Sequence, residues 1–262
     1  MPNLRPGFNI RDYNRYAWGR QVDLKNKFTV PVTHETIEAA RKGDFAVLLT
    51  ETKPVPQDWF PPFSELDLLG LACGGGQQGP VFAALGANVT IFDNSPAQLE
   101  QDHLVARQEG LQLRTVEGDM RDLSTFKDAS FDLIFHPVSN VFCPEIRPVW
   151  RECFRVLRPG GLLLAGFGNS VYFLFGTHID EQETLQIKYS IPYSDLEDLD
   201  PEELDAVIEE GSPLEYGHSL TDQIGGQIDA GFVITGFYED ICPDSPISKY
   251  HPEYIATRAE KR

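Results

Sequence analysis

Paired cysteines, long apolar runs and an excess of basic residues are all missing from this chain. Its four cysteines are scattered and show no C-x-x-C spacing, which predicts free thiols in a reducing compartment and no zinc site. No apolar run approaches the roughly 20 residues that a membrane span needs. Residues 1–20 also lack the apolar middle of a secretory signal. We therefore expect a cytoplasmic protein with no metal centre and no membrane association.

Basic residues are few relative to acidic ones. The chain has 22 Lys and Arg against 40 Asp and Glu, for a net charge of −18. Such a surface repels a phosphate backbone, so the composition disfavours a nucleic-acid partner. The excess is concentrated in residues 194–210, which carry nine acids and no base. We expect a solvated face or a mobile lid there, and the alternative is a dock for a cationic substrate.

The pattern along the chain indicates an N-terminal extension followed by an α/β domain. Residues 1–63 are rich in Tyr, Trp, Arg and Pro and contain one expected helix, 34–42, with Thr33 as its N-cap. Residues 64–262 form the expected main domain, and within it the acidic segment 169–217 interrupts the regular pattern as an insertion. We expect extension and insertion together to enclose a small substrate.

Apolar runs of strand length alternate with helical segments from residue 64 onward. The expected strands are 66–71, 88–92, 111–116, 131–135, 162–167, 232–238 and 254–257. The expected helices are 78–85, 97–108 (capped by Ser95), 146–157 (ended by a Pro-Gly-Gly turn) and 220–229. This order predicts a doubly wound, mostly parallel sheet with helices on both faces.

A glycine-rich turn follows the first of these strands. In CGGGQQG, Gly74, Gly76 and Gly79 satisfy the spacing G-x-G-x-x-G, and such glycines let the backbone turn tightly and approach a ligand. Asp93 ends the second strand, where a carboxylate can accept hydrogen bonds from both ribose hydroxyls. The unit predicts an adenosine-containing ligand, either a dinucleotide or S-adenosylmethionine.

Motifs further along the chain bear on this choice. VEGDM ends the third strand, FDLIFHPVSN contains the fourth, and VLRPGG precedes the fifth. In this order the motifs resemble those of the class I S-adenosylmethionine-dependent methyltransferases, and above all the small-molecule enzymes of ubiquinone and menaquinone biosynthesis. The resemblance covers about residues 64–168 and the segment AGFVITGFYED. It implies a Rossmann-like fold whose last strand is antiparallel.

The resemblance also implies S-adenosylmethionine as cofactor and a role for individual residues. The family usually has an acid in the first loop, whereas Asp67 lies early in the strand here, so the loop residues are assigned by position. The methionine part is expected at Ala72, Cys73, Gly74 and Gly76, the ribose at Asp93 and Asn94, the adenine at Asp119 and Met120, and the sulfonium near His136.

Methyl transfer is an in-line displacement for which a protein supplies alignment and a dry site. An oxygen or carbon acceptor also needs a base, and His136 and His218 are the candidates. Asn140 is a candidate for orienting a substrate oxygen. For these three residues the alternative is the capping of local backbone.

Aromatic residues of the extension are candidates for contact with the substrate. Tyr13 and Trp18 would lie over the reaction centre if the extension folds as a lid, and an aromatic face attracts a sulfonium. The alternative is a helix that packs these aromatic side chains on the core.

We therefore predict methyl transfer from S-adenosylmethionine to a small-molecule acceptor. An NAD-dependent oxidoreductase would share the glycine turn and Asp93, but it would leave GDM without a role, and no Tyr-x-x-x-Lys pair is evident to drive hydride transfer. A non-catalytic S-adenosylmethionine-binding protein would bind the cofactor without turnover. An RNA methyltransferase would need a basic strip, and the arginines at 147, 151, 155 and 158 follow one expected helix that should pack partly on the sheet.

Overall fold

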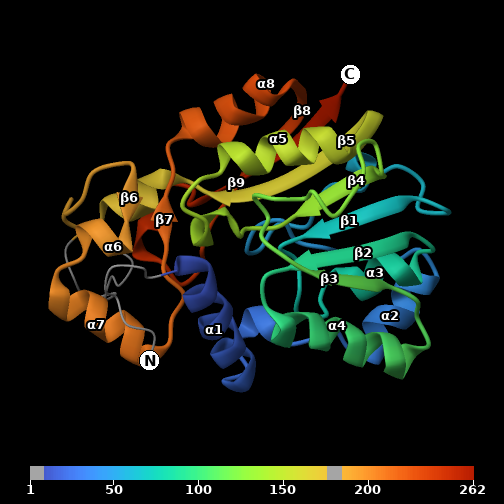
Figure 1. Ribbon diagram of the computed structural model, residues 1–262, viewed down its shortest axis with the longest axis horizontal. Helices are drawn as coiled ribbons and strands as arrows, with labels where there is room; N and C mark the ends of the chain where they lie inside the picture. The colour runs from blue at the N-terminus through green and yellow to red at the C-terminus, as the bar shows by residue number, and fades with distance from the viewer. Residues whose placement is uncertain (1–8, 176–184) are drawn as a thin grey trace.

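The fold is built on a seven-stranded sheet with the order β3-β2-β1-β4-β5-β9-β8. The computed structural model describes residues 9–175 and 185–262 (Figure 1). The strands are β1 Asp67–Leu71, β2 Asn88–Asp93, β3 Arg114–Glu117, β4 Phe131–His136, β5 Leu157–Gly168, β8 Phe232–Asp240 and β9 Tyr254–Lys261. The first five are parallel, and β9 is antiparallel to both of its neighbours. The predicted doubly wound sheet with an antiparallel last strand is confirmed.

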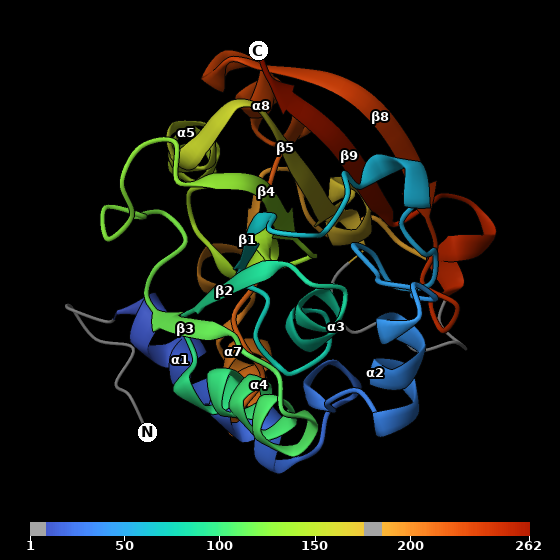
Figure 2. The ribbon, with the colours of Figure 1, turned by 90° about the vertical axis from the view of Figure 1, so that its right-hand side faces the viewer.

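Helices cover both faces of this sheet (Figure 2). On one face lie α2 His34–Arg41, α3 Gly79–Ala84 and α4 Pro96–Glu109, and on the other lie α5 Arg147–Val156 and α8 Gly226–Ala230. Neighbouring residues of β1 point to opposite faces of the sheet, as the pleat requires. Leu68 packs with Phe82 of α3, whereas Leu69 packs with Trp150 of α5. Because both faces are buried, β1 is almost entirely apolar.

Two expected helix caps are confirmed by the local geometry. The side chain of Thr33 accepts a hydrogen bond from the backbone N–H of Thr36 at the start of α2. Ser95 does the same for Gln98 at the start of α4, where Pro96 occupies the first helical position. Each cap satisfies a backbone donor that the helix itself leaves free.

One expectation about the elements was wrong, and one helix is confirmed with a different start. The Pro-Gly-Gly segment after α5 is not a separate turn, because Leu157 already pairs with Phe131 and the register shifts before Leu162 pairs with Leu133. The extra residues form an irregularity inside β5. The helix expected at 220–229 begins as a π-helix, Thr221–Gly225, and continues as α8.

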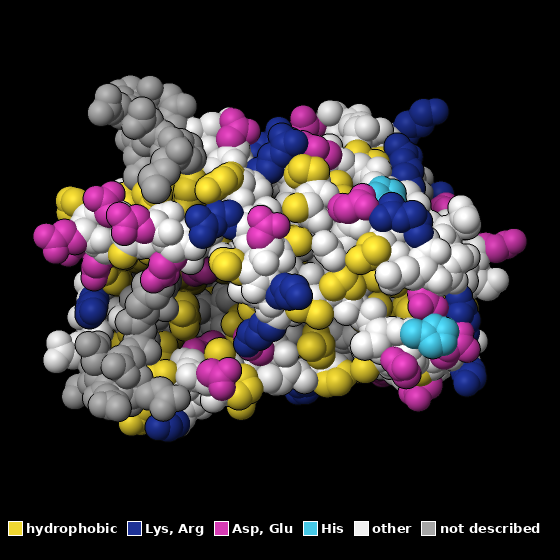
Figure 3. Space-filling model, turned by 90° about the horizontal axis from the view of Figure 1, so that it is seen from below, with side chains coloured by type: hydrophobic (Ala, Val, Ile, Leu, Met, Phe, Trp, Pro, Cys, Tyr) yellow, Lys and Arg dark blue, Asp and Glu magenta, His cyan; other side chains and the backbone are white. Residues whose placement is uncertain are grey.

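The extension contains a second helix, which was the alternative considered for its aromatic segment. It is α1, Ile10–Asp23, and it packs against α7, Pro201–Glu210, of the acidic segment. The insertion also contains α6, Asp195–Asp198, and a small sheet of β6, Tyr193–Ser194, with β7, Tyr216–Gly217. Acidic side chains gather on the outside of the end that carries α6 and α7 (Figure 3). The helix α1 of the extension therefore packs on the insertion, whereas α2 covers the sheet.

None of the helices in the described ranges has the length and apolar character needed to cross a membrane. The segments expected as extension and insertion include residues 1–8 and 176–184, respectively, which lie outside the described residues.

Candidate active site

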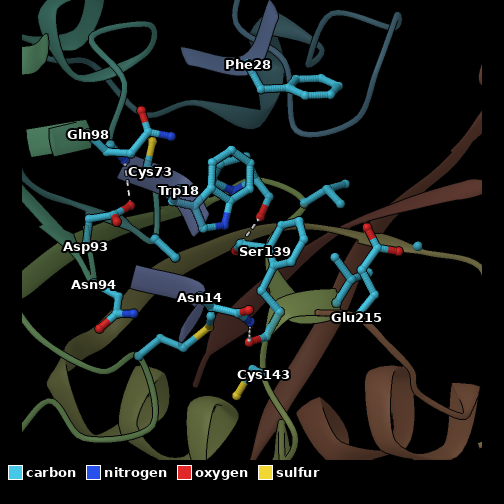
Figure 4. Close-up of a pocket in the computed structure, with 18 of the residues that line it drawn as sticks. Asn14, Trp18, Phe28, Cys73, Asp93, Asn94, Gln98, Ser139, Cys143 and Glu215 are labelled. Carbon is cyan, nitrogen blue, oxygen red and sulfur yellow. Dashed lines mark hydrogen bonds between the residues drawn. The ribbon is translucent and has the colours of Figure 1, made fainter. Parts of the chain in front are cut away.

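A cavity of about 330 Å³ lies at the carboxyl ends of the parallel strands (Figure 4). In open α/β sheets this edge is where ligands bind. The walls come from α1, the glycine loop after β1, the ends of β2 and β4, and the insertion. Of the residues expected in the site, those that line it are Trp18, Ala72, Cys73, Gly74, Asp93, Asn94, Asp119 and Met120.

The glycine loop is held tightly against α4. A Cβ on Gly74 would lie 2.7 Å from Cβ of Gln98, and Gly75 and Gly76 have φ values of 118° and 70°. These conformations and contacts favour glycine over any other residue. Gly76 does not line the cavity, and its carbonyl oxygen accepts a hydrogen bond from the backbone N–H of Val32.

Asp93 joins the end of β2 to this loop. Its Oδ2 accepts a hydrogen bond of 2.9 Å from the backbone N–H of Gly74, and its Oδ1 accepts one of 2.8 Å from that of Ser95. Burial raises the pKa of Asp93, while these backbone donors lower it in part. Each carboxylate oxygen has a second lone pair, so Asp93 can still accept from a ligand in the cavity.

Asn94 and Asp119 are engaged with arginines at the same end. Nε of Arg11 donates to Oδ1 of Asn94 at 2.9 Å, and Nδ2 of Asn94 donates to the carbonyl of Arg11 at 2.9 Å, so this pair ties α1 to β2. Arg121 forms a bidentate ion pair with Asp119. Burial acts to raise the pKa of Asp119, but the hydrogen bonds from Arg121 outweigh it and hold that pKa below its usual value.

The three residues expected to act in catalysis lie behind the cavity wall. The ring of His136 is fully buried, with Nδ1 2.8 Å from the carbonyl oxygen of Leu71 and Nε2 2.8 Å from Oδ1 of Asn140. His218 Nε2 lies 2.8 Å from the carbonyl oxygen of Cys143. Burial lowers the pKa of both histidines, which favours neutral rings. None of the three lines the cavity, and the partners of both histidines include backbone carbonyls distant in sequence, so the geometry supports a structural role better than that of a base.

Two aromatic residues of α1 lie in different surroundings. Tyr13 is buried against the insertion, and its hydroxyl donates to the carbonyl of Ser212 at 2.8 Å. Trp18 lines the cavity and meets the ring of Phe142 edge to face, with 5.0 Å between centroids. Tyr13 is therefore a packing residue of α1, and Trp18 is the one that can contact a ligand.

Asn14 was not expected in the site, yet it anchors α1 over the cavity (Figure 4). Its Nδ2 donates to the carbonyl oxygens of Phe142 and Leu214, each at 3.1 Å, and its Oδ1 accepts from the backbone N–H of Leu214 at 2.8 Å. A single polar residue in an aromatic segment shows no pattern that could have identified this role. Its partners are distant in sequence.

A group of possible metal ligands lies away from the cavity. The ligand atoms of His34, Glu38 and Glu109 lie within 4.8 Å of one another between α2 and α4. Arg41 forms ion pairs with both carboxylates. The guanidinium already supplies the positive charge that a metal would bring, so we interpret the group as a surface ion-pair cluster.

Comparison with known proteins decides between a dinucleotide and S-adenosylmethionine as the ligand. Residues 69–165 match the family model described as a methyltransferase domain. Over 249 residues, the chain is 51% identical to the uncharacterized methyltransferase YbaJ of Bacillus subtilis (strain 168), covering 95% of this chain and 97% of that protein. The chain belongs to the class I S-adenosylmethionine-dependent methyltransferases. The oxidoreductase alternative is thereby set aside, and the enzyme uses S-adenosylmethionine.

More distant relatives share parts of this methyltransferase. It is 31% identical over 110 residues to the ubiquinone biosynthesis O-methyltransferase of Maricaulis maris, a match that covers 41% of this chain and 42% of that protein. A crystal structure of an S-adenosylmethionine-dependent methyltransferase from Mesorhizobium loti superposes with a TM-score of 0.59 at 20% identity, covering 78% of this chain and 94% of that one. This structural likeness confirms the fold.

The cavity of the methyltransferase fits this cofactor. Gln98 is 5% exposed, lines the cavity, and its Oε1 has no hydrogen-bond partner within residues 9–175 and 185–262. A buried polar atom without a partner is unfavourable, and a ligand donor at the glycine loop would satisfy it. Asp93 offers acceptors to a ribose, and Phe92 and Met120 offer apolar surface to a base. These acceptors and this apolar surface thus suit an amino acid joined to a nucleoside.

The buried carboxyl group of Asp102 in α4 is expected to make the stability of the fold depend on pH. It is fully buried, its Oδ2 accepts from the backbone N–H of Gly75 at 3.1 Å, and its Oδ1 has no partner among the described residues. Burial raises the pKa of Asp102 to about 8. The folded state therefore binds this proton more tightly than the unfolded state does, and stability falls as pH rises from about 4 to about 8.

Asp102→Asn is expected to remove this part of the pH dependence. The amide is uncharged at every pH and can still accept from Gly75, so the variant should lose less free energy of unfolding between about pH 5 and about pH 8 than the parent does. Urea denaturation across that range measures the difference. Parallel stability profiles for parent and variant would contradict the assignment.

Proposed function

We propose that the methyltransferase transfers the methyl group to a small molecule held in the cavity that α1 covers. One observation carries this proposal. The cavity continues from the glycine loop past Ser139 to Glu215 on its opposite side, with Trp18 of α1 among its walls (Figure 4). A covered space of this size suits a small acceptor better than a polymer.

Surface charge supports the same choice. Arg147 pairs with Asp222 and Asp229, and Arg155 pairs with Asp128 and Glu152. Arg158, in β5, likewise pairs with acids at positions 67 and 132. The charges of these three arginines are thus largely neutralised, and the net charge of −18 disfavours a phosphate backbone.

The described thiols are free, three of them buried, which would suit the cytoplasm.

The cofactor is proposed to lie between the glycine loop and the ends of β2 and β3. Ala72, Cys73 and Gly74 would face its amino acid part, Asp93 its ribose and Met120 its adenine. Bound S-adenosylmethionine supplies an electrophilic methyl group on a sulfonium. The protein aligns the acceptor and excludes water.

His136 is proposed to be a positioning residue. It links the carbonyl of Leu71, at the end of β1, to Asn140 in the segment that follows β4. Ser139 of that segment lines the cavity. The buried ring therefore fixes the wall on which an acceptor would rest, and a role as base stays a prediction without support from its position.

Label transfer tests the proposed function. The purified protein is incubated with methyl-labelled S-adenosylmethionine and, separately, with the small-molecule, RNA and protein fractions of a cell extract. Label is expected in the small-molecule fraction. Label in RNA or protein would overturn the proposal, and calorimetric binding of the cofactor with no label in any fraction would favour a non-catalytic binder. NAD is the negative control for binding.

A further inference from the structure

The end of the cavity away from the cofactor residues contains two carboxyl groups with unmet interactions. Glu253 is 2% exposed, and its Oε2 accepts from the backbone N–H of Cys242 and from the hydroxyl of Ser248. Its Oε1 has no hydrogen-bond partner in the part of the chain that the structure describes. Glu253 lines the cavity, so a donor within the cavity would satisfy this atom.

Glu215 lies across the cavity from Asp93 and Asn94 (Figure 4). Its backbone N–H donates to Asp195 at 2.7 Å. Burial raises the pKa of the Glu215 carboxyl to about 8, and the negative charge of Asp195 adds to the effect. No cation among the causes lowers this pKa. A bound cation would therefore stabilise the ionised form of the Glu215 carboxyl group.

The positive side chains of the cavity region are engaged elsewhere. Arg11 is bound to Asn94 and Arg121 to Asp119, both at the cofactor end. Lys27 pairs with Glu51, a further residue of the wall. The end with Glu215 and Glu253 thus carries carboxyl groups without a matching side-chain cation within residues 9–175 and 185–262.

Aromatic side chains also lie near these carboxyls. Tyr172 lines the cavity, and after burial the charges of Glu215 and Glu253 are the next causes that raise its pKa, so the three groups lie within electrostatic range. Phe173 and Trp18 also line the space. Aromatic faces attract organic cations, and a desolvated setting strengthens that attraction.

We propose that the methyl acceptor carries a protonated amine, which Glu215 and Glu253 bind at this end of the cavity. The proposal rests on the proposed function, and it names the chemical class of the acceptor. Glu253 contributes a fixed oxygen without a partner, and Glu215 contributes the charge. The acidic insertion therefore supplies one inward carboxyl, while the acids of α7 lie on its outer side.

A matched pair of probes tests the proposal. The protein saturated with S-adenosylhomocysteine is titrated with 2-phenylethylamine and with its neutral analogue 2-phenylethanol, in two buffers of different ionisation enthalpy. The amine should bind about tenfold or more tightly than the alcohol. Near pH 7 it should release up to about one proton per molecule bound, because its charge ionises Glu215.

Variants separate this binding from the cofactor site. Glu215→Gln should abolish the amine preference and the proton release, whereas Glu209→Gln, on the exposed side of α7, should retain both. Equal affinity for the two probes, no binding of either, or an unchanged proton release in Glu215→Gln overturns the inference. Should that variant fail to fold, the parent's proton release and Glu253→Gln provide the same test.

Failure of the inference differs from failure of the proposed function. If S-adenosylhomocysteine binds and label reaches a small molecule, but the amine shows no preference, only the acceptor class is wrong. If label reaches RNA or protein instead, the small-molecule function itself is wrong.

Discussion

Asp93→Ala is expected to weaken S-adenosylmethionine binding by roughly five- to 150-fold, equivalent to about 1–3 kcal/mol. The change removes the acceptors proposed for the ribose. It also leaves the backbone N–H groups of Gly74 and Ser95 without their side-chain partner, so the glycine loop loses its link to β2. Titration calorimetry with S-adenosylmethionine and S-adenosylhomocysteine measures the loss.

Two further variants control for indirect effects. Asp93→Asn keeps the size and one carbonyl acceptor, so it should retain more affinity than the alanine variant. Glu100→Gln changes an exposed acid of α4 that pairs with Arg107, and its affinity should equal that of the parent. Unchanged cofactor affinity in a folded Asp93→Ala protein would refute the ribose assignment.

Gly166→Ala is expected to destabilise the fold by about 3 kcal/mol or more. Gly166 lies in β5, and a Cβ there would stand 2.0 Å from the carbonyl oxygen of Leu49, a backbone atom of the extension. That same oxygen accepts a hydrogen bond from the backbone N–H of Val138, so it cannot shift without loss. The midpoint of thermal unfolding should fall by roughly 6–12 °C.

Gly168→Ala is the matched control because it changes the next residue on the same face of β5. Its Cβ would lie 3.5 Å from Cγ1 of Val141, an ordinary contact. We expect little change in the melting temperature of this variant. Equal melting temperatures for the two variants would show that the extension does not pack on β5 as described.

Local patterns predicted most of the sheet, and most of the residues they assigned to the cofactor line the cavity. Buried strands appear as apolar runs, caps lie next to the helices they start, and the glycine turn lies between two strands. The same local pattern indicates Asp93 as a candidate ligand-binding residue, because its partner in the glycine loop, Gly74, is only 19 positions away. Each of these signals depends on residues that are close in sequence.

The packing of α1 on the insertion shows why other parts could not be predicted. Two of its buried residues, Asn14 and Gln21, are polar, so no apolar stripe marks the helix. They are tolerated inside because the backbone at Leu214 and Gly211 supplies their hydrogen bonds. A helix whose inner face is satisfied by a segment about 200 positions away has no local pattern.

The sequence by itself determined an α/β fold with a glycine loop after β1 and an acid at the end of β2, and it predicted methyl transfer, because those features are built from neighbouring residues. The tertiary structure decided that His136 and His218 lie behind the wall and that Glu215 and Glu253 face the cavity. The insertion contributes one of these acids and the start of β9 is next to the other. Only folding brings such segments together, and burial then changes the chemistry of the groups they carry.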